Sequence, residues 1–452
     1  MMKKAGILCL AAALSLSFFG CSNGANKPSG TDGKKVTVNV WNHNTNMKEL
    51  QQELVDKFNA EHDDIQIALN LVADKYNDVL NMAMSSEEDV DVFSVGGPSL
   101  TKKAADLGWA EPLDDYMTPE FKGMFKDSVW VNNNNVIKGK TYVLPDQVAT
   151  YRMLYNKKLF AAAGLDPENP PKTYEAFRQA AKQITERGGA DVKGFAMAMA
   201  DAYHIDGVFF NGLGYSSFGT LQGYDYAKGA FDFSVFRPAI ELIRNVKADG
   251  SMVEGELLLK PDQVRSSFAE GKIGMIASAS WEASTFETLA PDFEVGITNW
   301  PTVDGTPKGK NTIQVGSGFA MSAKTKNKEA AWTVLEFLAS PAFTGEINKQ
   351  AGNIGVYKDE AATEGYANPY VEGFLPNDTD GTWPAVVPSL KLQGDNRTVV
   401  FTRLISEETV DIDAELKDLT DRTNQAFEKA VAAGDIEKAD YIIENFDPMS
   451  LQ

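Results

Sequence analysis

The chain has 452 residues, of which 43% are hydrophobic and 23% charged, a balance typical of a soluble globular protein with room for two domains. Its formal net charge of −20 at pH 7 would repel phosphate groups, so nucleic acids and anionic membrane surfaces are poor candidates for partners. The two cysteines, Cys9 and Cys21, precede the expected folded part, and the three histidines are scattered. We therefore expect no disulfide, no metal site and no cofactor there.

The N-terminus predicts export and anchoring. Residues 1–20 begin with Lys3 and Lys4 and continue as an apolar run typical of a signal peptide, too short for a membrane span. The next residue, Cys21, stands where the lipobox of bacterial lipoproteins has its lipidated cysteine, although Phe18 replaces the usual Leu of that motif. Residues 21–35 then form a polar stretch that predicts a flexible tether. The expected location is extracytoplasmic, in the periplasm or at the cell surface, with only the lipid in the membrane; plain signal cleavage is the alternative.

From residue 36 onward, predicted strands and amphipathic helices alternate. The predicted strands cover residues 36–41, 65–71, 90–95, 139–142, 151–155, 194–199, 273–277 and 294–298. The predicted helices cover residues 47–58, 75–85, 99–107, 157–163, 174–187, 236–249 and 328–338, and the chain is predicted to be helical from about Pro384 to its end. Such alternation indicates an α/β fold in which helices cover both faces of mostly parallel sheets.

No enzyme motif is complete. Gly139-Lys140-Thr141 ends like a phosphate-binding loop, but Asn134 stands where that loop has its first glycine. Residues 316–321 lack the third glycine of a dinucleotide loop, and the Ser-x-x-Lys tetrad at 99–102 lacks its partner motifs. A carboxylate pair for glycoside hydrolysis stays open, because 63 acidic residues supply many pairs. We expect a binding protein and no enzyme.

Four segments of the chain are informative together. They are residues 36–58, a strand, a polar loop and a helix; 140–171, with Leu-Tyr-Asn-Lys-x-Leu-Phe before Ala-Gly-Leu; 268–281, Phe-Ala-Glu-Gly-Lys through Trp281; and 315–341, a glycine-rich strand before a helix. In this order they resemble the extracellular solute-binding proteins of ATP-binding-cassette importers, and most of all the sugar-binding branch that includes the maltose-binding type.

The resemblance implies a two-lobe fold of the periplasmic-binding-protein kind. Lobe 1 would comprise residues 36–148 and 316–354, and lobe 2 residues 149–315 and 355–452 with a helical C-terminal tail. The chain would cross between the lobes near Val148, Val315 and Ile354. A small ligand, a sugar in this branch, would close the lobes, and the closed monomer would dock on the transmembrane subunits of a permease.

Sugars present hydroxyl edges and apolar faces, so their sites need aromatic platforms and polar planar groups. Trp281 follows the strand 273–277, at the carboxyl end of a sheet where α/β proteins bind ligands, and in the resembled family this Trp stacks on the ligand. The other predicted ligand-binding residues stand after strands, on the crossing segment or at the start of the tail: Asn42, His43, Gly97, Ser99, Asp146, Tyr151, Tyr203, His204 and Trp383.

Structural roles compete with these assignments. Trp281 could be a core residue, Asn42 and His43 could cap or solvate a loop, and His204 could be a satisfied surface histidine. A different solute, such as glycerol phosphate or a polyamine, is the alternative within binding proteins; a phosphate would favour Arg152 or Lys75 in the site. From other classes, the alternatives are a secreted lipoprotein glycoside hydrolase and a surface adhesin.

Overall fold

The computed structural model describes residues 35–45, 47–73, 75–86, 88–315, 317–358, 366 and 368–451. The predicted signal peptide, Cys21 and the rest of the tether up to residue 34, and also Gly316, lie outside the described residues. Within that part of the chain, no helix combines the length and the apolar character that are needed to cross a membrane.

The first lobe is built on a five-stranded sheet with the strand order β2-β1-β3-β16-β6. Strand β1 is parallel to β2 and β3, and β16 is antiparallel to both of its neighbours. The strands are β1 (Val36–Asn42), β2 (Ile65–Leu71), β3 (Val92–Val95), β6 (Leu144–Pro145) and β16 (Gly318–Met321). The helices around the sheet are α1 (Lys48–Glu61), α2 (Tyr76–Ser85), α3 (Pro98–Asp106), α4 (Pro119–Gly123), α11 (Lys328–Leu338) and α12 (Glu346–Ala351).

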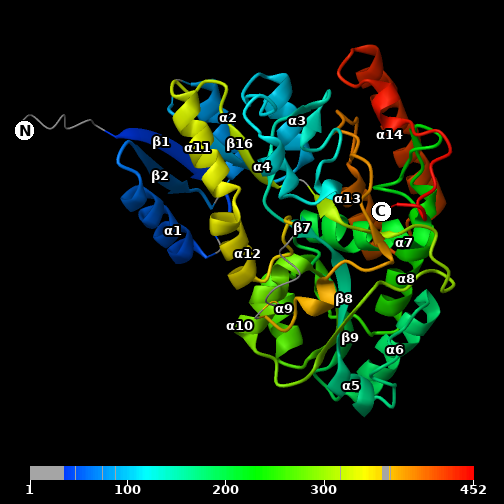
Figure 1. Cartoon of the computed structure of the whole chain (residues 1–452). Helices are drawn as coiled ribbons and strands as arrows, with labels where there is room; N and C mark the ends of the chain where they lie inside the picture. Colours follow the sequence, from blue (N-terminus) through cyan, green and yellow to red (C-terminus); the bar gives the residue numbers. More distant parts are fainter. Residues whose placement is uncertain are drawn as a thin grey trace, which may run out of the picture.

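Both faces of this sheet are buried because successive strand side chains point to opposite sides. Val92 packs into a cluster with Val55 of α1 and Leu335 of α11. The next residue, Phe93, packs into a second cluster with Leu80 of α2. Helices therefore cover the sheet on both sides, as the alternation of apolar segments predicted (Figure 1).

The second lobe is built on a four-stranded sheet with the strand order β13-β8-β12-β9. Strand β8 is antiparallel to both neighbours, so the other three strands share one direction. The strands are β8 (Tyr151–Asn156), β9 (Lys193–Ala196), β12 (Ile273–Ala279) and β13 (Val295–Thr298). The helices of this lobe are α5 (Lys157–Ala162), α6 (Tyr174–Arg187), a π-helix (His204–Phe210) that leads into α7 (Asn211–Phe218), α8 (Arg237–Ala248), α9 (Pro261–Ala269), α10 (Ala283–Leu289), α13 (Arg397–Ser406) and α14 (Ile412–Ala432).

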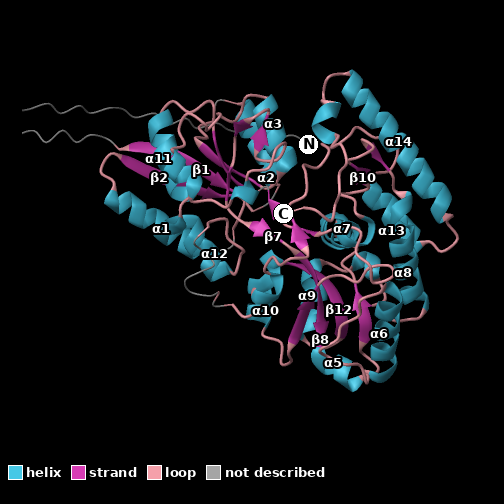
Figure 2. Cartoon of the chain, turned by 45° about the vertical axis from the view of Figure 1, so that its right-hand side comes forward, coloured by secondary structure: helices cyan, strands magenta, loops and turns pink. Residues whose placement is uncertain are grey.

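Three segments meet between the two sheets. Val148 of β7 (Val148–Ala149) pairs with Val315 of β15 (Gln314–Val315), and its N–H donates to the carbonyl of Ile354 at 2.9 Å. Figure 2 shows β7 at this junction, with one sheet on either side. Beyond Ile354, Tyr357 still bridges to Phe125 of the first lobe. The remaining two-residue strands are β4 (Val136–Ile137), β5 (Lys140–Thr141), β10 (Tyr224–Asp225), β11 (Ala230–Phe231), β14 (Asn311–Thr312) and β17 (Asp380–Gly381).

The predicted helical tail is present as α13 and α14, but its predicted boundaries need a correction. Residues 384–396 form no helix, because Pro384 and Pro388 lack the backbone donor that a helix needs and Gly394 adopts a left-handed φ of 80°. Helix α13 begins only after Asn396, whose side chain accepts a hydrogen bond from the N–H of Val399. After α14 the chain has one 3₁₀ turn, Lys438–Tyr441, and is otherwise irregular.

A buried ion pair links β8 to β17. The guanidinium of Arg152 lies 2.7 Å from Oδ2 of Asp380, and the side chains of both residues are at most 1% exposed. The N–H of Asn377 donates to the same carboxylate oxygen. Breaking such a pair leaves one charge buried without compensation, which costs about 3–5 kcal/mol, more than an exposed pair contributes.

We predict that Asp380→Ala lowers the free energy of unfolding by about 3–5 kcal/mol, because the Arg152 charge stays buried without a partner. Urea unfolding followed by circular dichroism measures the loss. The control is Asp421→Asn, which breaks the exposed Lys417–Asp421 pair and should cost less than about 1 kcal/mol. Equal losses in the two variants would contradict a structural role of the buried pair.

Candidate functional site

Three of the predicted aromatic residues meet at one end of the second sheet. Tyr151 opens β8 and pairs with Ala279, the last residue of the antiparallel strand β12. The following 3₁₀ turn therefore brings Trp281 against Tyr151, with ring centroids 5.7 Å apart and planes at 89°. Tyr203 also contacts Trp281, with centroids 6.1 Å apart, and its hydroxyl is hydrogen-bonded to that of Tyr151. The three rings form what we call the aromatic platform.

The platform combines ring faces with hydroxyl groups. Trp281 is half-buried and Tyr203 exposes 51% of its surface, so both rings have area left for a ligand. Tyr151 is buried, and its hydroxyl donates to the side-chain oxygen of Gln314 on β15. Burial raises the pKa of Tyr151 well above its usual 10, so its hydroxyl stays protonated at neutral pH. Gln314, which the sequence alone did not single out, thus links the platform to the junction between the lobes.

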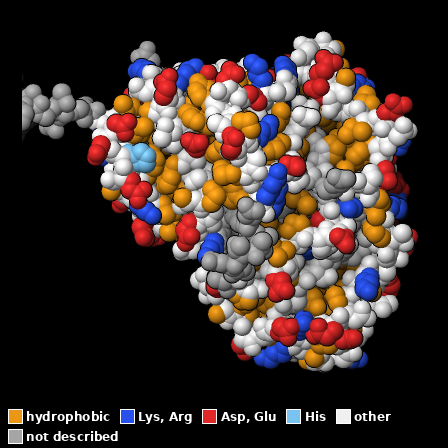
Figure 3. Space-filling model, in the orientation of Figure 1, with side chains coloured by type: hydrophobic (Ala, Val, Ile, Leu, Met, Phe, Trp, Pro, Cys, Tyr) orange, Lys and Arg blue, Asp and Glu red, His pale blue; other side chains and the backbone are white. Residues whose placement is uncertain are grey.

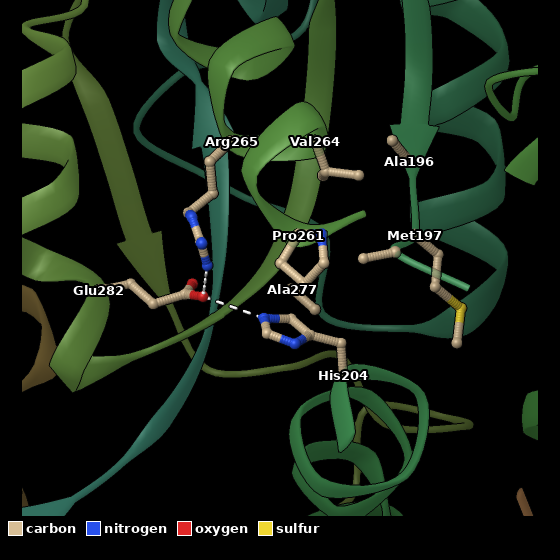
Figure 4. Close-up of a pocket in the computed structure, with 9 residues that line it drawn as sticks. Ala196, Met197, His204, Pro261, Val264, Arg265, Ala277 and Glu282 are labelled. Atoms are coloured by element: carbon tan, nitrogen blue, oxygen red, sulfur yellow. Dashed lines mark hydrogen bonds and ion pairs between the residues drawn. The ribbon is translucent and has the colours of Figure 1, made fainter. Parts of the chain in front are cut away.

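A charged cluster lies directly beside the platform and lines a small pocket between β9, α9 and the turn after β12 (Figure 4). Nε2 of His204 is 3.1 Å from Oε1 of Glu282, and the guanidinium of Arg265 bonds the same oxygen. Burial would raise the pKa of Glu282, but His204 and Arg265 outweigh it and keep that pKa below its usual value. The sequence prediction missed Glu282 and Arg265, since nothing in their local pattern marks them.

The predicted residues after β1 have partners of their own. Asn42 is buried, its amide donates to Oε1 of Gln51 at 2.9 Å, and it accepts from the N–H of Asn44. His43 is half-buried, and both its N–H and its Nδ1 contact the hydroxyl of Ser94. Burial lowers the pKa of His43 below its usual 6.5, so this ring is neutral near pH 7. The side chain of Asn42 therefore stabilises the loop after β1 through its hydrogen bonds. The ring of His43 is uncharged and can still form a hydrogen bond through Nε2.

The start of α3 is open. Gly97 is the N-cap residue of α3, and a Cβ at Gly97 would meet no heavy atom within 4 Å. Ser99 is exposed in the first turn of the helix. Helix N-termini carry free backbone N–H groups, which suit a hydroxyl or an anion.

Asp146 is held at the junction. Its Oδ1 accepts from the hydroxyl of Ser317 at 2.5 Å, and its backbone carbonyl accepts from the amide of Asn348 at 2.7 Å. Together with Asn42 and Asn353 it lines a small polar cavity. Burial raises the pKa of Asp146 from 3.8 to about 6, although the hydrogen bond from Ser317 works in the opposite direction.

Trp383 and Arg152 have structural roles. Trp383 is 5% exposed, packs 5.0 Å from the ring of Tyr215, and donates its indole N–H to the carbonyl of Lys310. The prediction that Trp383 closes a cleft is therefore not supported by its position in the core. Arg152 is sealed in the ion pair with Asp380 and is unavailable to a phosphate, while Lys75 is exposed just before α2. Among the described residues, no group of three or more His, Cys, Asp or Glu side chains could hold a metal ion.

Comparisons with known proteins agree with this architecture. The model of the family described as bacterial extracellular solute-binding protein matches residues 41–344. A protein of Brucella abortus strain 2308, named as a binding protein, is 28% identical over 374 residues, 81% of this chain and 84% of that one. The diacetylchitobiose binding protein of Streptomyces coelicolor is 27% identical over 358 residues, 76% of this chain and 79% of its own.

A solved structure shows the same fold. The GacH receptor of Streptomyces glaucescens, determined unliganded and in complex with acarbose, superposes with a TM-score of 0.68 at 18% identity. The match covers 88% of this chain and 99% of the receptor. At this identity the likeness shows the fold: two α/β lobes joined by crossing strands.

We predict that Asp146→Asn stabilises the protein near neutral pH. The carboxyl of Asp146 has a higher pKa in the folded chain than in the unfolded chain, so its contribution to stability is complete below about pH 3.8 and is lost as the pH rises through about 6. At about pH 7.5 the variant should gain about 1–2 kcal/mol, and at about pH 3.5 nothing. Thermal unfolding at the two pH values measures both.

The matched comparison is Ser317→Ala, which removes the hydroxyl donor but keeps the carboxyl. This variant should destabilise the protein at about pH 7.5, because the ionised carboxylate loses its hydrogen bond. A stability gain for Asp146→Asn that is the same at both pH values would contradict the protonation argument.

Proposed function

Because the chain belongs to the bacterial extracellular solute-binding protein family, we propose that it captures a mono- or oligosaccharide between its lobes and delivers it to an ATP-binding-cassette permease. The family match spans two thirds of the chain and places the protein outside the cytoplasm. Members of the family bind solutes without transforming them, so the chain is not an enzyme.

The aromatic platform is the observation that carries the sugar assignment. A pyranose ring presents apolar C–H faces, which favour contact with rings such as Trp281 and Tyr203, and hydroxyl edges, which need hydrogen-bonding groups nearby. The half-exposed ring of Tyr203 and the half-buried ring of Trp281 supply the aromatic surface for the apolar faces. The hydroxyls of Tyr151 and Tyr203 supply the hydrogen-bonding groups for the hydroxyl edges. The relatives named for sugars support the same class.

A phosphorylated solute is less well supported. Arg152, one of the two basic residues considered for a phosphate, is used by Asp380 inside the second lobe. On the face drawn in Figure 3, basic side chains lie scattered among acidic ones. A binding site attracts an anion through clustered positive charge. The formal net charge of −20 repels an anionic solute instead.

Closure of the lobes is the proposed mechanism. His43, Gly97 and Asp146 belong to the first lobe, and the aromatic platform belongs to the second, with the paired strands β7 and β15 between them. A ligand that contacts both sets stabilises the closed form over the open one by its differential affinity. Few backbone dihedrals near Val148 and Val315 would have to change.

The N-terminal segment and the permease complete the proposed function. We propose that residues 1–20 direct export, that lipid on Cys21 anchors the chain, and that residues 21–35 give the folded lobes reach above the membrane. The closed monomer would then present its surface to the transmembrane permease subunits. These steps rest on the sequence pattern and on the family of the chain.

We predict that the soluble chain beginning at Ser22 is stabilised by a sugar. A thermal-shift screen against mono- and oligosaccharides, with glycerol phosphate and polyamines included, would identify the solute. A ligand at about 100 times its Kd should add about 2.7 kcal/mol. Trp281→Ala should abolish the shift or weaken the Kd at least about tenfold, because the apolar sugar face loses its platform.

The matched control is Trp332→Ala. Trp332 is likewise half-buried but lies on α11 of the first lobe, where it stacks on Tyr116 at 5.5 Å. This variant should keep the wild-type ligand shift. If only a phosphorylated or cationic solute stabilises the protein, the sugar assignment is wrong and the solute-binding assignment stands.

A further inference from the structure

Two residues of the aromatic platform are each followed by a charged partner. Tyr203 precedes His204 at the start of the π-helix, and Trp281 precedes Glu282 at the end of its 3₁₀ turn. The pair between Nε2 of His204 and Oε1 of Glu282, at 3.1 Å, joins segments that are 78 residues apart in the chain. Besides the contact between the rings themselves and the hydrogen bond of Tyr203 to Tyr151, this pair links the two backbone segments that carry Tyr203 and Trp281.

Glu282 is fixed from further sides. Its residue is 2% exposed, its Oε2 accepts from the hydroxyl of Ser278 at 2.6 Å, and its Oε1 is also bound by Arg265 of α9. Figure 4 shows the side chains of Arg265 and His204 pointing at this carboxylate from two different sides. A buried carboxylate held by β12, α9 and the π-helix has little freedom to move, so it can fix the turn that carries Trp281.

The histidine contact depends on the proton. Nδ1 of His204 lies 3.3 Å from Oδ1 of Asp201, so both ring nitrogens face carboxylate oxygens. Only the protonated imidazolium donates from both nitrogens; a neutral ring would point one lone pair at a carboxylate. Arg265 shares the Glu282 carboxylate with His204 and also pairs with Asp262. Asp206, two residues further along the π-helix, is paired with Arg397.

We propose that Glu282 is a positioning residue for the ligand platform and that, through His204, it makes solute affinity highest while His204 is protonated. The inference rests on the proposed function and adds a regulation of the same site. When the pH rises and His204 loses its proton, one of its two hydrogen bonds and the ion pair with Glu282 are lost. The link between the segments that carry Trp281 and Tyr203 then weakens, and the aromatic platform is less well ordered for a ligand.

The pKa of His204 is consistent with this geometry. Burial alone would lower it, but the hydrogen bond and the charge of Glu282, with Asp201, raise the pKa of His204 above its usual 6.5. A group with a raised pKa in the folded state stabilises that state below the unfolded pKa, and this contribution is lost as the pH rises through the folded pKa. The change therefore falls above the usual pKa of 6.5.

The first experiment needs no ligand. The histidine and Trp indole N–H resonances of the whole soluble chain are followed by NMR from about pH 5.5 to about pH 8.5, and His204→Asn and Trp281→Phe assign the two signals. We expect the indole signal of Trp281 to shift with the same midpoint as the ring of His204. In Glu282→Gln the midpoint of His204 should fall and the indole signal should no longer follow it. A Trp281 signal that does not titrate with His204 in the wild type would overturn the proposal.

The second experiment measures binding. Calorimetry with maltotriose, raffinose and diacetylchitobiose as probes gives the Kd at about pH 6 and about pH 8.5, and for a probe that binds, the wild-type Kd should weaken about tenfold. Glu282→Gln should bind weakly with little dependence on pH. The matched control is Asp249→Asn, which breaks the Arg178–Asp249 pair of the same lobe and should keep the wild-type pH dependence.

The outcomes separate the two proposals. A wild-type Kd that is equal at both pH values, or a Glu282→Gln variant that keeps the full pH dependence, would overturn the positioning role. Failure of all three probes to bind would count against the sugar assignment alone, because the coupled titration of His204 and Trp281 is measured without ligand. Circular dichroism of Glu282→Gln and His204→Asn checks that both variants are folded.

Discussion

The backbone pairing at Val148 is the constraint on which the rest of the structure depends. Val148 is bonded on one side to Val315 and on the other to Ile354, so the passages between the lobes are held together as one small sheet. Tyr151 follows this point by three residues and Gln314 is the neighbour of Val315, so the site begins where the junction ends. Any rotation of one lobe against the other must therefore move the groups of the candidate site.

Two ion pairs in the second lobe each join a buried carboxylate to a basic side chain, but they differ in how they respond to pH. Arg152 and Asp380 are sealed from solvent and join β8 to the chain that returns from the first lobe. An always-charged guanidinium in that position gives an interaction that no physiological pH change can switch. Glu282 instead meets a histidine beside a half-exposed tyrosine, so protons can reach the pair. The first pair suits a fixed scaffold and the second a site that responds to its surroundings.

The π-helix at His204–Phe210 shows how the lobe presents its polar residues. Its later residues, including Phe209 and Phe210, are fully buried in the core of the lobe, while His204 at its start faces the charged cluster. The wider turn of a π-helix is rare and is often found at functional sites, because it displaces side chains from the regular helical stripe. Here it places Tyr203 next to Trp281 while the apolar side of the same segment stays in the core.

Local pattern alone determined much of this protein. The 3.6-residue period predicted α6 and α11 to their observed ends, the strand β2 was predicted residue for residue, and the strand-end rule placed Trp281 and Tyr203 at one sheet edge. The helical C-terminal tail was confirmed, but it begins at Arg397 and not at Pro384, because prolines interrupt the segment before it. Whether Trp383 faces a ligand, whether Arg152 is free, and that Glu282 meets His204 were decided by the tertiary structure alone. The burial of these side chains and their pairing with residues far away in the sequence depend on how β8 and β12 bring remote segments together. The local periodicity of the sequence holds no information about such contacts.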